Sequence, residues 1–184
     1  MSKNLLVASM LVVGLIVGTG IGYYLTPEYR ETMYTKSMDL GMADRLVDLR
    51  YLNAMTAHHR GAMLLAKQAE QSQRTEIRDL AAAIQRDEPK LIDELYAWKK
   101  QWYRDTRRVR DPLPAQLGAY DEKLDLRFLN ALIAHHEEGI RMTQEIRAKS
   151  SRTEVLNNAD AVEAFLKTTL VTLKDWRRAW YNVN

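Results

Sequence analysis

Apolar and polar positions divide the chain into an uncharged opening segment and four stretches with helical spacing. From Leu5 to Leu25 the sequence has 21 residues without a charge. As a helix rising ~1.5 Å per residue, such a segment spans roughly 31 Å, the thickness of a bilayer core. We therefore predict an N-terminal transmembrane anchor over residues 1–27, and a helical arm over residues 28–47 that joins the anchor to the rest of the chain.

The anchor also predicts how the chain is placed in a cell. A short amino end that carries Lys3 stays most simply in the cytoplasm. The protein is then single-pass in the inner (plasma) membrane, and its remaining part lies on the periplasmic or extracellular side. A cleaved signal peptide is the alternative, but the segment lacks an Ala-x-Ala site and its apolar run continues past its small residues.

Glycines at a four-residue spacing mark one face of the predicted anchor. Gly14, Gly18 and Gly22 line that face, and small residues let a second helix approach closely within a bilayer. The sequence therefore indicates a transmembrane helix partner in addition to the lipid bilayer itself. The alternative is that glycine is simply common in membrane spans.

Two segments of the remaining chain repeat each other. Residues 48–59 align with residues 125–136, and nine of the twelve positions are identical. The match resumes at residues 72–77 against 150–155. It then continues with Trp98, Trp102 and Tyr103 against Trp176, Trp180 and Tyr181. Each copy therefore predicts a helix, a short polar turn and a second helix.

The two copies predict an all-α fold. Each helical hairpin has a single apolar stripe and cannot bury it alone, so the hairpins should pack as a four-helix bundle. Pro112, Pro114 and Gly118 break the helix between the copies. We expect up-down-up-down order, in which the first and third helices run parallel. The predicted bundle covers residues 48–184, with repeat one at 48–104, a connector at 105–120 and repeat two at 121–184.

Composition and charge exclude several classes of function. The chain has no cysteine, which excludes disulfides, thiolate zinc sites and iron–sulfur clusters. Its 27 basic and 24 acidic residues are largely interspersed, so we expect no nucleic-acid partner. No Ser-His-Asp order and no phosphate-binding glycine loop is present, and the sequence does not indicate an enzyme.

All four histidines lie in two equivalent pairs, His58–His59 and His135–His136. Imidazole binds copper, zinc or iron, and a thioether selects copper(I). The apolar stripes predict that His59 and His136 face inward at a similar height. Met55 and Met142 lie within helical reach of the pairs. The alternatives are a hydrogen-bonded histidine layer in the core and methionines that only fill space.

One carboxylate falls within an apolar stripe of the predicted bundle. Glu88 lies between Ile84 and Leu91, immediately before Pro89, and its counterpart in the second copy is Leu166. An inward carboxylate needs a partner, which would be one of the histidines, an arginine or a metal. Alternatively, a kink at Pro89 turns Glu88 outward.

The repeated His-His motif resembles the ferritin-like "domain of unknown function 305" family. Met55-x-x-His58-His59 recurs as Leu132-x-x-His135-His136 with Met142 following, and the resemblance covers about residues 46–181. It implies a helical bundle, often anchored or exported, and some members are associated with periplasmic copper binding. Family members usually continue with Gln, then Glu-Ile, before a Met and a Trp, where this chain has Glu88, Leu91, Ile92 and Leu95. The ligands implied for a copper ion are His58, His59, His135, His136, Met55 and Met142.

The sequence therefore predicts a membrane-anchored, extracytoplasmic helical bundle that binds copper or another transition metal through paired histidines. The alternative is an accessory subunit of a larger membrane protein complex, with structural histidines and no metal. A third reading is a haem or redox site with one histidine from each repeat, although the chain has no Cys-x-x-Cys-His motif for covalent haem.

Overall fold

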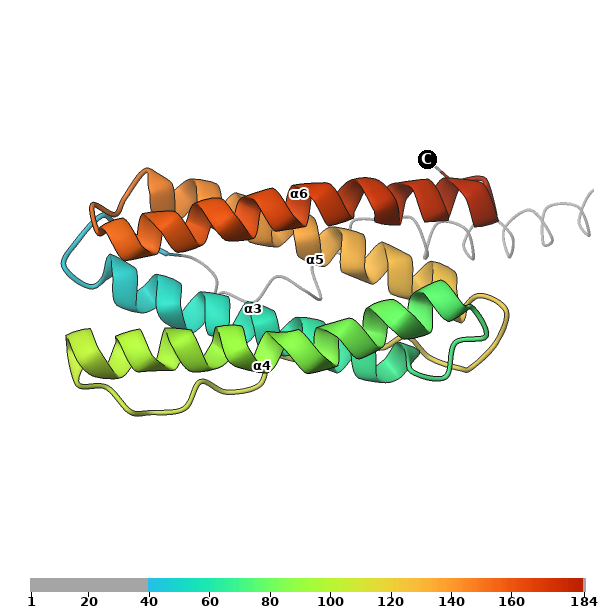
Figure 1. The fold of residues 1–184 in the computed structure, drawn as a ribbon, viewed down its shortest axis with the longest axis horizontal. Coiled ribbons are helices and arrows are strands. Elements are labelled where there is room, and N and C mark those ends of the chain that lie inside the picture. The colour runs from blue at the N-terminus through green and yellow to red at the C-terminus, as the bar shows by residue number, and fades with distance from the viewer. Residues whose placement is uncertain (1–39, 184) are drawn as a thin grey trace, which may run out of the picture.

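The computed structural model describes residues 40–183, and this part of the chain is a four-helix bundle without strands. The predicted anchor and residues 28–39 of the predicted arm lie outside the described residues. Within residues 40–183, no helix is long and apolar enough to cross a membrane. The helices, in the numbering of Figure 1, are α3 (Val47–Ala69), α4 (Thr75–Tyr103), α5 (Leu124–Arg147) and α6 (Thr153–Tyr181).

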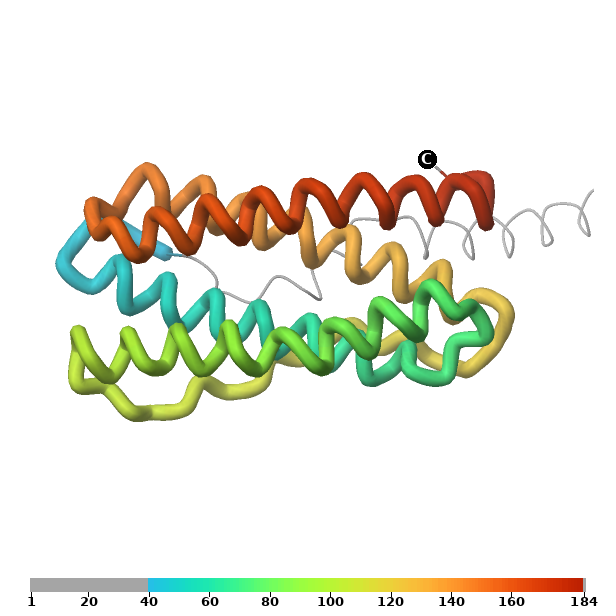
Figure 2. Tube along the Cα trace, viewed as in Figure 1, coloured from blue at the N-terminus to red at the C-terminus, as the bar shows by residue number. Residues whose placement is uncertain are grey.

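The order of helix directions differs from the expected up-down-up-down arrangement. The start of α5 lies beside the α3–α4 turn, where the Ser72 hydroxyl donates to Asp125 at 2.6 Å. Helices α3 and α5 are therefore antiparallel, and α4 and α5 run in the same direction (Figures 1 and 2). The prediction that the first and third helices run parallel is wrong.

The connector between the copies explains this arrangement. Residues 104–123 run back along the bundle before α5 begins (Figure 2). On the way, Gln68 near the end of α3 donates to the Ala115 carbonyl and accepts from the Leu117 amide. Extended chain reaches roughly 3.3 Å per residue, whereas a helix rises only ~1.5 Å per residue. Residues 104–123 are therefore long enough to return along the full length of α4, which has 29 residues.

The antiparallel contact relates the two hairpins by an approximate two-fold axis. At one end Asp48 accepts from the Ser150 hydroxyl at 2.6 Å and from Arg152 at 3.1 Å. At the other end the equivalent Asp125 accepts from Ser72 and pairs with Arg74 at 3.5 Å. The two arginines also stack on equivalent indoles, Arg152 on Trp102 and Arg74 on Trp180. Each hairpin turn is thus fastened to the first helix of the other copy.

The turn before each first helix also belongs to the repeat. Gly41 and Gly118 adopt positive φ angles of 62° and 75°, which glycine accepts without strain. Arg50 donates to the Leu40 carbonyl at 2.6 Å, and Arg127 donates to the Leu117 carbonyl in the same way. Residues 40–46 therefore form an irregular turn rather than the last part of a helical arm, and α3 begins at Val47.

Candidate metal site

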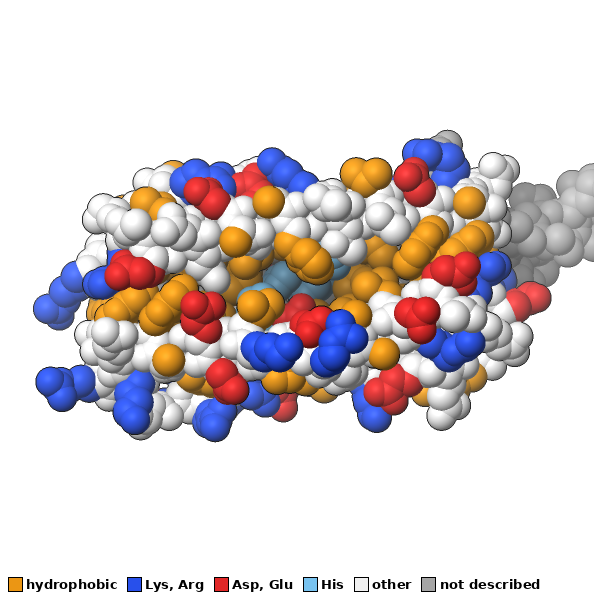
Figure 3. All heavy atoms as spheres, in the orientation of Figure 1, with side chains coloured by type: hydrophobic (Ala, Val, Ile, Leu, Met, Phe, Trp, Pro, Cys, Tyr) orange, Lys and Arg blue, Asp and Glu red, His pale blue; other side chains and the backbone are white. Residues whose placement is uncertain are grey.

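A groove of about 560 Å³ runs between α4 and α6, and α3 and α5 form its floor. Figure 3 shows this hollow on the face of the molecule, with apolar side chains along it and histidine at its base. Its walls are mainly apolar, with carboxylates and amides toward one end. The lining side chains include Leu80, Ile84, Glu88, Leu91, Glu94 and Trp98 from α4, and Asn157, Asn158, Val162, Phe165 and Leu166 from α6.

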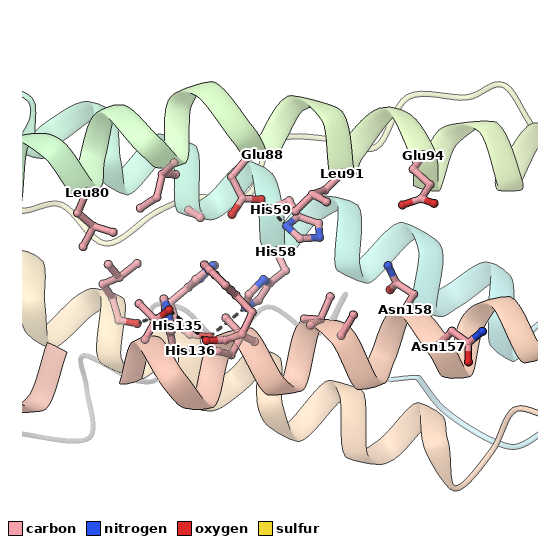
Figure 4. A pocket seen from close by; sticks show the side chains of 18 of the residues that line it. His58, His59, Leu80, Glu88, Leu91, Glu94, His135, His136, Asn157 and Asn158 are labelled. Atoms are coloured by element: carbon pink, nitrogen blue, oxygen red, sulfur yellow. Dashed lines mark hydrogen bonds and ion pairs between the residues drawn. The ribbon is translucent and has the colours of Figure 1, made fainter. Parts of the chain in front are cut away.

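All four histidines line this groove, and their side chains are buried. His58 and His135 stack across the α3–α5 contact, with ring centroids 3.8 Å apart and ring planes 18° apart (Figure 4). His59 and His136, which were expected to face inward, are buried and line the groove as well, but the contact between the two copies is made by His58 and His135. The cause is the antiparallel arrangement, because the two-fold axis between α3 and α5 passes beside the first histidine of each pair.

Gly139 on α5 leaves the space that the His58 imidazole of α3 occupies. A Cβ atom on Gly139 would lie 2.6 Å from Nε2 of His58 and 2.6 Å from Cδ1 of Leu166. The equivalent residue in the first copy is Ala62. Gly139 carries no recognisable signal as a site residue when one copy of the repeat is read alone. The difference between the copies at this position is the signal that would have identified it.

Three hydrogen bonds fix which nitrogen carries the proton in the rings of His58, His59 and His136. Nε2 of His58 contacts the His135 carbonyl at 3.0 Å, and Nδ1 of His136 contacts the Leu132 carbonyl at 2.9 Å. Nδ1 of His59 contacts the Glu88 carboxylate. Because carbonyls and carboxylates only accept, each of these nitrogens is the donor, and the other nitrogen of a neutral ring has a free lone pair.

Four buried ring nitrogens have no protein partner among the described residues. These buried atoms are Nδ1 of His58 and Nε2 of His59, His135 and His136. Leaving a buried polar atom unsatisfied costs roughly 1–3 kcal/mol, so four such atoms around one groove are unusual in a packed core. A free imidazole lone pair is the form of histidine that binds a metal ion.

Burial holds three of the four imidazoles, those of His58, His135 and His136, in their neutral form. Burial lowers the pKa of His58 to about 4, and the neighbouring His59 adds to this effect. Burial also lowers the pKa of His136 to about 4, with a contribution from His58. The pKa of His135 is lowered well below its usual value, again mainly by burial. At neutral pH these rings therefore do not need to lose a proton before they bind a cation.

Glu88 points inward, which resolves the two alternatives left open by the sequence. Its carboxylate pairs with Nδ1 of His59, and the two side chains are 14% and 6% exposed (Figure 4). Pro89 lies inside α4, which continues from Thr75 to Tyr103. Of the partners considered for an inward carboxylate, the structure therefore selects His59.

The two predicted methionine ligands lie in the same half of the bundle. Met55 and Met142 are fully buried in one apolar cluster with Tyr51, Leu52 and Ile146. In the other half, the equivalent positions Leu132 and Leu65 share the second apolar cluster. Met55 lies three residues from His58, or about 4.5 Å along the helix axis. Both thioethers are thus collected on one side of the histidine layer.

The donors form a layer rather than a finished coordination sphere. Across residues 40–183, no group of three or more His, Cys, Asp or Glu side chains is already gathered closely enough to hold a metal ion. The structure thus brings together the four predicted histidines around the groove and the two predicted methionines in the adjoining core. It adds Glu88 to this set through the contact with His59.

Comparison with known proteins places the chain in a family. Residues 48–122 and 125–184, more than half of the chain, match the family described as "Domain of unknown function (DUF305)". The chain belongs to this family. No curated protein matches this DUF305 member.

Solved structures of a protein named CopM share the fold. Its Ag-bound form is 27% identical to this DUF305 chain with a TM-score of 0.65, covering 73% of this chain and 97% of CopM. Its Cu(I)-bound form is 28% identical with a TM-score of 0.64 and the same coverage. Its apo form is 27% identical with a TM-score of 0.64, covering 73% and 98% of the two chains.

Replacing Gly139 by alanine should disturb the histidine layer. The added Cβ would meet the side-chain tips of His58 and Leu166 at 2.6 Å, so these side chains must shift from their packed positions. We expect the free energy of unfolding to fall by about 1–3 kcal/mol, although alanine has the better helix propensity. Chemical denaturation measures this change. The control is Gly61→Ala, where the nearest atom is 3.3 Å away and a smaller loss is expected. A Gly139→Ala protein as stable as the original would contradict the close approach.

The buried imidazoles should make stability depend on pH. Unfolded histidine takes up a proton near pH 6.5, whereas folded His58 and His136 do so only near pH 4. Their contribution to stability is therefore complete above pH 6.5 and is lost as pH falls toward 4. Each should lower the free energy of unfolding by up to about 1.4 kcal/mol per pH unit. Denaturation of the metal-free protein between pH 7 and pH 5 tests this, and His136→Gln should give a shallower slope. A flat profile over that range would contradict the assignment.

Proposed function

We propose that this protein is a membrane-anchored, extracytoplasmic metal-binding protein whose helical bundle holds copper through the paired histidines. The observation that carries the proposal is the set of four buried ring nitrogens that lack partners among residues 40–183. A core histidine layer with a purely structural role would use both nitrogens of each ring. In this protein one nitrogen of each ring remains available to a ligand from outside the chain.

The kinds of donor atom favour copper over other metals. Neutral imidazole suits copper and zinc, whereas a thioether selects copper(I). The four ligands proposed from the histidines are His58, His59, His135 and His136, and Met55 and Met142 add sulfur in the half of the bundle beside His58. The similarity to CopM, which was solved in Cu(I)-bound, Cu(II)-bound and Ag-bound forms, supports this choice.

Access to the site supports the same function. The groove lined by the histidines is open along the face shown in Figure 3, so an ion can reach the buried rings without unfolding of the bundle. Apolar walls of Leu80, Ile84 and Leu166 lower the polarity around the bound ion. The bound metal supplies the chemistry of a soft or borderline cation, and the chain supplies neutral donors and restricts the entry of water.

The purified full-length protein should bind copper at a stoichiometric level. We expect His58→Ala combined with His135→Ala to lose most of the bound copper, because both stacked imidazoles and their unpartnered nitrogens are removed. Elemental analysis after removal of free metal measures the copper content, and circular dichroism confirms that the variant is folded. Wild-type protein that is folded and copper-free after incubation with Cu(I) and with Cu(II) would contradict the proposed function.

The methionines allow a second, independent variant. Met55→Leu with Met142→Leu gives this half of the bundle the residues that the other half has at equivalent positions. The fold should therefore be retained. Loss of both thioethers should weaken Cu(I) binding by at least tenfold while Cu(II) binding changes little, as measured by competition with a chromophoric chelator for each ion. Equal effects on both ions would contradict a direct role for sulfur.

The membrane anchor and the outward placement of the bundle are part of this proposal. They rest on the uncharged segment from Leu5 to Leu25 and on Lys3 before it. We expect the full-length protein to remain in the membrane fraction after a carbonate wash, and protease added to spheroplasts to digest the bundle. A chain without residues 1–27 should be released in soluble form. Recovery of the full-length protein in the soluble fraction would contradict anchoring.

A further inference from the structure

Glu88 makes the two copies of the repeat chemically different at the metal site. At the equivalent place in the second copy, Leu166 lies against the groove, buried and close to Gly139. The two histidines concerned, His59 and His136, occupy equivalent positions and both leave Nε2 without a partner among the described residues. The two histidines differ in the group that accepts the hydrogen bond from Nδ1.

That difference is visible in the hydrogen bonds. Nδ1 of His136 turns back to the Leu132 carbonyl of its own helix at 2.9 Å. Nδ1 of His59 instead reaches across to the Glu88 carboxylate on α4 (Figure 4). A carbonyl is a neutral acceptor, whereas a carboxylate carries a full negative charge. The hydrogen bond from Nδ1 therefore ends on a charged carboxylate at His59 and on a neutral carbonyl at the equivalent His136.

A carboxylate on the far nitrogen changes an imidazole as a ligand. It holds the ring in the tautomer that offers Nε2, fixes the ring orientation and raises the basicity of the ligating nitrogen. The negative charge also lies close to the bound cation in a groove with apolar walls, where screening by water is weak. Both effects stabilise a doubly charged ion more than a singly charged one.

We propose that Glu88 is a positioning residue that directs Nε2 of His59 toward the metal and gives the site its affinity for divalent copper. This inference rests on the proposed function and specifies it further. The site then has two chemically distinct sides. The His59–Glu88 pair favours Cu(II), and the half that contains Met55 and Met142 favours Cu(I).

The test compares affinities for the two copper ions in the full-length protein. Glu88→Gln keeps the size and an acceptor oxygen but removes the charge, and Glu88→Leu introduces the residue type of the second copy. We expect both variants to lose about 10- to 100-fold in Cu(II) affinity. Cu(I) affinity, measured anaerobically with a reductant, should change by less than about threefold, because the charge effect is smaller for a monovalent ion.

A matched control separates contact from general charge. Glu94 lines the same groove on the same helix but lies farther along it, toward Asn157 and Asn158 (Figure 4). Glu94→Gln removes an equal charge from the groove and should leave the Cu(II) affinity within about threefold of the original. The paramagnetic resonance spectrum of bound Cu(II) should change in the Glu88 variants and stay unchanged in the Glu94 variant.

The outcomes distinguish this inference from the proposed function. If the wild-type protein binds copper and Glu88→Gln binds both ions as the wild type does, the role of Glu88 is refuted and the proposed function stands. Equal losses for Cu(I) and Cu(II), or an equal Cu(II) loss in Glu94→Gln, refute it as well. If folded wild-type protein binds neither ion, both proposals are refuted together.

Discussion

The close contact between α3 and α5 at His58 and His135 is the constraint on which the rest of the arrangement depends. Two imidazoles stack there, and Gly139 leaves no room for a further methyl group. Beside this contact, His59 reaches Glu88 on α4, whereas His136 bonds to the Leu132 carbonyl of its own helix. Because the contact is antiparallel, it also brings Met55 and Met142 into one half of the bundle and their leucine counterparts into the other.

Much of this architecture was accessible from the sequence. The duplicated motif and the three- and four-residue apolar spacing predicted four helices in two hairpins, and these are present. The relative direction of the hairpins was not accessible, because a connector with prolines and a glycine is compatible with either direction. It is determined by tertiary contacts such as Ser72 with Asp125, whose residues lie 53 positions apart.

The same limit applies to the candidate site. A helical stripe places neighbouring side chains about 100° apart, so it shows that one member of each His-His pair faces a partner helix but not which one. The structure buries both members of each pair, and the antiparallel packing places His58 against His135. For Glu88 the sequence left both directions open, since the effect of Pro89 on the helix depends on packing around it. The contact of Gly139 with His58 was not accessible either, because a glycine in a helical stretch does not show which side chain of another helix packs against it.

The approximate two-fold axis through the histidine layer has an evolutionary consequence. Two separate copies of a single hairpin could form the same layer, but every substitution would then appear on both sides at once. In a fused chain each half can diverge alone, and this chain has done so with Glu88 against Leu166 and with methionine against leucine in the flanking clusters. Gene duplication followed by fusion thus allows an asymmetric pocket inside a symmetric framework, which a homodimer of hairpins cannot encode.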